Sequence, residues 1–160
     1  LDGPNGDDPA LRPNQLLAAS LPFRLLPEAQ LRSVVRACER ALLTPAGLRS
    51  LAADEPGYIP HYGGDQRARD GAYHQGTVWA WLIGPFVDAH LAAFGDVARL
   101  ERILHPLGDQ LRLAGLGTVS EIFEAAPPHA PRGCMAQAWS VAEYLRAWSR
   151  VDRAGRAGGA

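Results

Sequence analysis

Segments with helical periodicity alternate along this chain between two kinds, apolar on one side and apolar all round. Residues 27–43 and 96–111 each place apolar side chains at helical spacing on one face and charged side chains on the other. Residues 75–94 and 134–150 are apolar in most directions, and the short segment 13–21, which opens with proline, is mostly apolar as well. A helix that is apolar all round must be buried on every side. The order is therefore buried, one-faced, buried, one-faced, buried.

This order predicts an all-α fold in which an inner shell of helices is wrapped by an outer shell. An α/α toroid has that arrangement, because each of its helical hairpins places one helix inside and the next outside. A solenoid of stacked helix pairs is the alternative, but the chain shows no repeat of fixed period, which such arrays require. No segment shows the alternation of a half-buried strand, so no sheet is expected.

Several residues mark the expected boundaries of these helices. Thr44-Pro45 ends the first long helix, Gly84-Pro85 is expected to kink or restart the next, and Asp96 is expected to cap the following one. Residues 46–70 carry no convincing period and predict a loop longer than a connector needs, which favours a functional role.

The two ends of the chain differ from the middle in composition. Residues 1–11 are rich in Gly, Asp and Pro and are expected to be a linker or loop from a larger chain. Residues 12–150 are expected to form the helical portion. The segment 151–160 holds Gly, Ala and Arg with little to bury, so it is predicted to be a disordered tail.

Charge and cysteine content exclude several classes of function. The formal net charge of −1 favours neither a nucleic-acid groove nor an anionic membrane surface as partner. No apolar run has the length of a membrane span, and the first residues do not resemble a signal peptide. Cys38 and Cys134 lie far apart and outside any metal-ligand spacing. A cytoplasmic protein with reduced cysteines, no metal and no cofactor is expected.

Residues 70–81 hold an acid, a phenol, an imidazole, an amide and two indoles. Indole faces and hydrogen-bonding side chains together are typical of a sugar-binding pocket. Tyr73, His74 and Gln75 come at the start of an inner helix and are expected to face the mouth of the toroid. Trp79 and Trp81 are expected to be mainly core, with one or two of the tryptophans touching a sugar. A structural histidine is the alternative for His74.

Glu121 is the carboxylate most suggestive of chemistry. It lies among apolar Val119, Ile122 and Phe123, in a loop where a structural acid would more naturally be exposed. Partial burial suits a carboxyl group to proton transfer. A helix cap or a surface acid is the alternative reading. In the long loop, aromatic and basic residues including Arg49 and Tyr62 either rim the pocket or are incidental.

Four blocks of sequence resemble one known family. They are Arg-Pro-Asn-Gln at 12–15, the block at 42–51, Arg-Asp-Gly-Ala-Tyr-His-Gln-Gly-Thr-Val-Trp at 69–79, and Thr-Val-Ser-Glu-Ile-Phe at 118–123 together with 132–143. These blocks are similar to the C-terminal catalytic part of the glycogen debranching enzyme family, the amylo-α-1,6-glucosidase domain. The similarity runs from about residue 12 to residue 148.

The resemblance implies part of an (α/α)6 toroid and hydrolysis of α-1,6-glucosidic branch points with inversion, using one carboxylic acid and one carboxylate base. It places the general base at Glu121 and requires no cofactor. The implied substrate is a branched α-glucan, glycogen or limit dextrin. The residues it suggests for glucose contact are Asn14, Gln15, Arg49, Tyr62, Tyr73, His74, Gln75, Trp79, Gln137 and Trp139.

The chain departs from the family pattern in three places. Ala80 stands where proline is frequent, and Glu124-Ala125 where Asp-Gly is usual. The family's general acid is an aspartate near a Trp-Gly-Arg-Asp motif, which this chain lacks, and five helices cannot close a twelve-helix ring. The rest of a parent chain is therefore expected to carry the general acid, and this chain alone is expected to be inactive. A non-catalytic helical module that binds glycan or protein, or a related trehalase-like or glucosylglycerate-type hydrolase, is the alternative.

Overall fold

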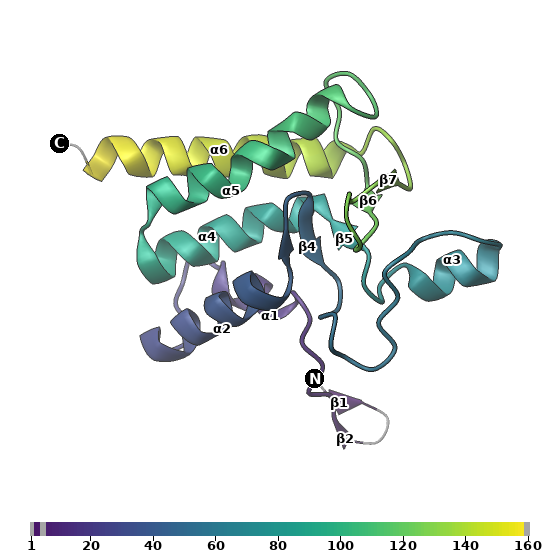
Figure 1. Ribbon diagram of the computed structural model, residues 1–160. Coiled ribbons are helices and arrows are strands. Elements are labelled where there is room, and N and C mark those ends of the chain that lie inside the picture. The colour runs from purple at the N-terminus through teal and green to yellow at the C-terminus, as the bar shows by residue number, and fades with distance from the viewer. Residues whose placement is uncertain (1, 4–5, 159–160) are drawn as a thin grey trace.

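Four helices, α2, α4, α5 and α6, form the body of the computed structural model, which describes residues 2–3 and 6–158 (Figure 1). The helices are α1 (Gln15–Ala19), α2 (Glu28–Ala41), α3 (Gln66–Ala72), α4 (Ile83–Phe94), α5 (Val97–Asp109) and α6 (Ala138–Gly158), with 3-10 turns η1 (Ala80–Leu82) and η2 (Gln110–Arg112). The strands are β1 (Asp2–Gly3), β2 (Gly6–Asp7), β3 (Leu43–Thr44), β4 (Gly47–Arg49), β5 (Val78–Trp79), β6 (Ile122–Phe123) and β7 (Pro131–Arg132).

Five of the strands form one antiparallel sheet in the order β3-β4-β5-β6-β7. Its register pairs Leu48 with Trp79 and Val78 with Phe123. The strands join the ends of the long helices: β3 follows α2, β5 leads through η1 into α4, and β6 and β7 connect α5 with α6. The sheet therefore lies at one end of the helical body (Figure 1) and gathers chain segments that are distant in sequence.

The expectation of a purely helical chain is wrong, although the helix-rich character is confirmed. Strands of two or three residues are too short to show a period of two. Their apolar side chains are also buried on both faces, as Leu48, Val78, Ile122 and Phe123 are all fully buried. An element of this kind leaves no alternation in the sequence. Membership of a toroid stays a prediction.

Within the predicted helix 75–94, residues 78–82 form β5 and η1, and α4 begins only at Ile83. Pro85 consequently lies in the first turn of α4, where its missing N–H costs no helical hydrogen bond, so it causes no kink in mid-helix. The predicted loop 46–70 contains β4 and most of α3.

The chain ends also differ from expectation. The predicted linker 1–11 contains the β1-β2 pair, and residues 1, 4 and 5 lie outside the described residues. Helix α6 begins at Ala138, later than predicted, and continues to Gly158. In place of the disordered tail predicted for 151–160, residues 151–158 are helical, because Val151 is buried and Gly155 packs close to Val97. Residues 159–160 lie outside the described part of the chain.

The core forms around α4, whose residues are buried on nearly every side, as predicted. Helix α2 packs Leu31, Val35 and Cys38 against the core and exposes its opposite face to solvent. Burial raises the pKa of the Cys38 thiol to about 12. Helix α5 begins at the predicted cap, since the Asp96 carboxylate accepts a hydrogen bond from the backbone N–H of Arg99 at 2.9 Å.

One buried histidine makes the stability of this core depend on pH. His90 in α4 is only 3% exposed, its Nδ1 has no hydrogen-bond partner within the described residues, and its Nε2 lies 3.9 Å from Glu39. Burial lowers its pKa below 6.5; Arg99 lowers it further, while Glu39 and Asp96 partly oppose the shift. The unfolded chain therefore binds a proton near pH 6.5 that the folded chain does not bind.

We therefore expect the free energy of unfolding to be highest above pH 6.5 and to fall as the pH drops below it. The His90→Gln variant should show a weaker dependence over the same range, because it removes the titrating group. Urea unfolding between pH 5 and 8 measures both slopes. Equal slopes in the two proteins would contradict this assignment.

Candidate functional site

Three chain segments meet at the carboxylate of Glu121, which directly precedes β6. The hydroxyl of Tyr73 donates a hydrogen bond to Oε1 of Glu121. The backbone N–H of Cys134 donates to Oε2 at 3.0 Å, and the backbone N–H of Glu121 donates in return to the carbonyl of Cys134 at 2.8 Å. The carboxylate is therefore held from both sides, while its side chain remains half-buried.

Tyr73, which follows α3, links this carboxylate to a group of aromatic rings. Its ring lies 4.8 Å from that of Trp79 at 67°, and the indole N–H of Trp79 donates to the Tyr73 carbonyl at 3.2 Å. His74 stacks on Trp79 with ring centroids 5.1 Å apart. Trp139 contacts both Trp79, at 6.1 Å, and Trp81, at 5.5 Å. The segment predicted as a sugar site is thus packed against the start of α6.

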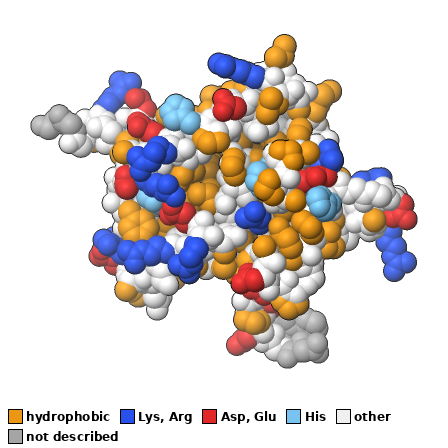
Figure 2. Space-filling model, in the orientation of Figure 1, with side chains coloured by type: hydrophobic (Ala, Val, Ile, Leu, Met, Phe, Trp, Pro, Cys, Tyr) orange, Lys and Arg blue, Asp and Glu red, His pale blue; other side chains and the backbone are white. Residues whose placement is uncertain are grey.

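The tryptophans line a cavity of about 260 Å³. Trp79, Trp81 and Trp139 supply its aromatic walls, and His74 and Asn14 lie at its polar edge. Hydrophobic side chains are exposed over the end of the molecule that carries the short strands (Figure 2). Of the predicted contact residues, the structure brings together Asn14, His74, Trp79 and Trp139 in this cavity.

Arg12 also lines the cavity, although it is not among the glucose contacts predicted from the sequence. Its guanidinium donates to the carbonyl of His74 at 2.8 Å, the carbonyl of Ser50 at 3.2 Å and Oε1 of Gln75 at 2.7 Å. The amide of Gln15 donates to the Arg12 carbonyl at 3.1 Å. Gln15 and Gln75 thus hold Arg12 and do not line the cavity. Its place in the Arg-Pro-Asn-Gln block could have indicated that Arg12 belongs to the site.

The other predicted residues lie outside the cavity. Tyr62 packs beside Tyr73, with ring centroids 5.8 Å apart. Arg49 donates to the carbonyl of Ala125 at 3.3 Å, and its buried Nε has no partner within the described residues. Gln137 is half-buried just before α6, and its backbone N–H donates to Val119 at 3.1 Å.

A second carboxylate, Glu124, lies three residues after Glu121 but has a different environment. It forms an ion pair with Arg132 at 2.7 Å and a hydrogen bond with Nδ1 of His61 at 3.2 Å. In the described part of the chain Glu121 forms no ion pair. Both of its hydrogen bonds come from neutral donors, a hydroxyl and a backbone N–H. Burial and the hydrogen bond to Glu121 together raise the pKa of Tyr73, so its hydroxyl keeps its proton and stays a donor. Glu124 is therefore paired with a cation, whereas Glu121 is held by neutral donors.

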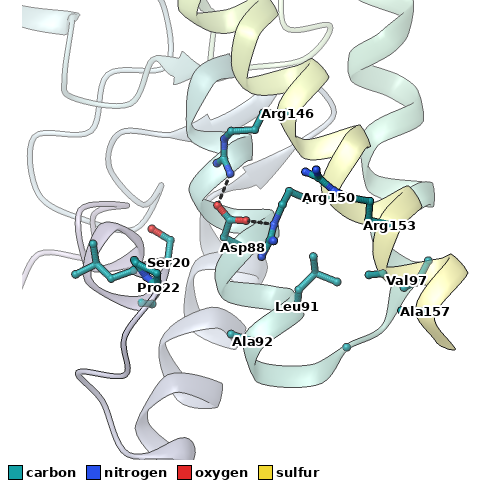
Figure 3. A pocket seen from close by; sticks show the side chains of 14 residues that line it. Ser20, Pro22, Asp88, Leu91, Ala92, Val97, Arg146, Arg150, Arg153 and Ala157 are labelled. Carbon is teal, nitrogen blue, oxygen red and sulfur yellow. Dashed lines mark hydrogen bonds and ion pairs between the residues drawn. The ribbon is translucent and has the colours of Figure 1, made fainter.

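A larger groove of about 930 Å³ lies at the opposite end of α4 and α6 (Figure 3). Its carboxylate, Asp88, forms ion pairs with Arg146 at 2.5 Å and Arg150 at 3.0 Å. None of the described residues that line it has an aromatic ring. A neutralised acid without a stacking surface fits neither proton transfer nor sugar binding, so the smaller aromatic cavity is the candidate site.

Over residues 2–3 and 6–158, no helix is long and apolar enough to cross a membrane. Over the same residues, no three His, Cys, Asp or Glu side chains cluster as metal ligands.

The chain is similar to one protein family and to curated proteins. The sequence profile described as Amylo-alpha-1,6-glucosidase matches residues 1–146. The glycogen debranching enzyme of Saccharomyces cerevisiae is 34% identical over 90 residues. That alignment covers 52% of this chain and only 6% of the yeast protein, so the chain corresponds to a small part of that relative.

Proposed function

Because the chain belongs to the amylo-alpha-1,6-glucosidase family, we propose that it is part of a glycogen-debranching glycoside hydrolase and supplies the general base, Glu121. One observation supports this most directly. Glu121 is half-buried, held by Tyr73 and Cys134, and connected through Tyr73 to the rings around the aromatic cavity. Hydrolysis of a glucoside uses a pair of carboxyl groups, of which Glu121 would be one.

In the proposed reaction, Glu121 takes a proton from a water molecule as the water oxygen bonds to the anomeric carbon of the branching glucose. The bond from that carbon to the glucan oxygen breaks on the opposite face, and a carboxylic acid protonates the leaving oxygen. Inversion converts the α-linkage to free β-glucose. An inverting pair is about 6.5–9.5 Å apart. We propose that the acid lies in the rest of the parent chain.

For the substrate we propose a branched α-glucan such as limit dextrin. Trp79, Trp139 and His74 offer flat surfaces for a glucose ring, and Asn14 and Arg12 offer hydrogen bonds to its hydroxyls. The yeast relative is named a glycogen debranching enzyme, which agrees with this choice. A trehalase-like hydrolase or a non-catalytic glycan-binding module would also use such a cavity.

Substrate profiling of the complete parent enzyme separates these possibilities. We expect glucose release from limit dextrin, with the β-anomer appearing first by proton NMR, and no release from trehalose. The 160-residue chain alone should release none under the same conditions. Release of α-glucose, or faster hydrolysis of trehalose, would contradict the proposed linkage and outcome. Binding of dextrin without hydrolysis would favour the non-catalytic module.

A further inference from the structure

The geometry around Glu121 points to a positioning device that the sugar-contact prediction did not contain. We propose that Tyr73 and the turn at Gly133-Cys134 act as positioning residues that hold the Glu121 carboxylate in one orientation, and that Tyr73 is not a glucose contact. This inference rests on the proposed role of Glu121 as general base. It assigns a role to Gly133, which lies in the block 132–143 but is not among the predicted site residues.

The contacts of Tyr73 fix its hydroxyl in the direction of Glu121. Its hydroxyl bonds the carboxylate, and its ring is fixed by Trp79, His74 and Tyr62 at centroid distances of 4.8, 5.0 and 5.8 Å. Neither Tyr73 nor Glu121 lines the aromatic cavity, so the hydrogen-bonded pair lies beside it, while His74 and Trp79 line it. A ring held on three sides has little freedom to turn its hydroxyl toward a sugar.

On the other side of the carboxylate, the close approach of the turn depends on glycine at position 133. Its φ of +66° is left-handed, and a Cβ built on it would overlap Oε2 of Glu121 and lie 3.1 Å from Cγ1 of Ile122. The absence of a side chain lets the turn approach closely enough for the N–H of Cys134 to donate to Oε2 at 3.0 Å. The two carboxylate oxygens thus have separate neutral donors, one from a side chain and one from the backbone.

A general base that is fixed in direction needs no reorientation when the attacking water arrives. Preorganised hydrogen bonds of this kind act on the chemical step more than on substrate binding. Loss of the Tyr73 hydroxyl should therefore slow turnover more than it weakens substrate binding.

The first test is Tyr73→Phe in the complete parent enzyme, assayed on limit dextrin. We expect kcat to fall about 10- to 100-fold with KM within about twofold. Tyr144→Phe is the matched control, because Tyr144 on α6 packs against α5 beside Gly108, away from the site, and should leave both constants unchanged. A raised KM with unchanged kcat would make Tyr73 a sugar contact and overturn the proposal, as would an unchanged kcat.

The second test compares two glycines of nearly equal φ. Gly133→Ala should lower kcat about 10-fold or more, because the new methyl group displaces the carboxylate. Gly95→Ala carries the same backbone strain at φ +64° but meets nothing within 4 Å, so its kcat should match that of the unmodified enzyme. Equal kcat in the two variants would overturn the role given to Gly133.

A direct measurement on the 160-residue chain keeps this inference separable from the proposed function. The ¹³Cζ chemical shift of Tyr73 at neutral pH should differ between Glu121→Gln and the unmodified chain, because the Tyr73 hydroxyl donates to a carboxylate in one and meets an amide in the other. An unchanged chemical shift would show that Tyr73 and Glu121 are not in contact. If Glu121→Gln retained full turnover in the enzyme, the proposed function would fail even with the contact intact.

Discussion

Replacing Glu121 with glutamine is expected to reduce glucose release from limit dextrin by about 10²- to 10⁴-fold, the contribution typical of a positioned general base. Glutamine has the shape of glutamate, so its oxygen can accept from the N–H of Cys134 and its NH₂ can donate to the hydroxyl of Tyr73. The amide cannot take a proton from water. Turnover should therefore fall while the fold and the affinity for dextrin are retained.

The assay compares kcat of the two enzymes on limit dextrin, with dextrin affinity measured by calorimetry. Glu101→Gln is the control, since Glu101 is an exposed acid on α5, away from the site, and its loss should change neither quantity. Near-normal turnover of the Glu121 variant would refute its assignment as the base. A loss of dextrin affinity with little change in kcat would make Glu121 a binding residue.

The long helices could be predicted from their apolar patterns. Helices α2 and α5 each have a strong apolar period and bury one stripe, and Asp96 is a residue type common at helix starts. Helix α4 could be predicted because it is apolar on nearly every side. Helix α3 could not be predicted this way, because its described residues bury only Ala72 and it has no apolar face. Its cap at Asp65, which accepts from the N–H of Ala68, was the one local signal.

The sheet and the contacts around Glu121 depend on tertiary structure. Tyr73 and Glu121 are 48 residues apart in sequence, and the pairing of β5 with β6 brings their segments together. Residue chemistry alone indicated that both belong to a polar and aromatic site. It could not show which would line the cavity and which would support the carboxylate, because that distinction depends on side-chain direction.

Replacing Gly47 with alanine is expected to lower the free energy of unfolding of the 160-residue chain by about 3 kcal/mol or more. Gly47 has φ +133°, which L side chains rarely adopt, and this strain costs about 1–3 kcal/mol. A Cβ there would also lie 2.6 Å from the carbonyl oxygen of Trp79 and 2.8 Å from Cα of Ala80. Both are backbone atoms, so β4 and β5 would have to separate, which adds about 1–3 kcal/mol.

Urea unfolding followed by tryptophan fluorescence measures this loss, and Gly117→Ala separates its two causes. Gly117 also has a positive φ, +75°, but a Cβ there meets nothing within 4 Å, so only strain of about 1 kcal/mol is expected. A larger loss at Gly47 would mean that the close approach of β4 to β5 requires glycine there. Because β5 carries Trp79, that approach also sets the wall of the aromatic cavity. Equal losses in the two variants would leave backbone conformation as the sole requirement and contradict this account of the sheet.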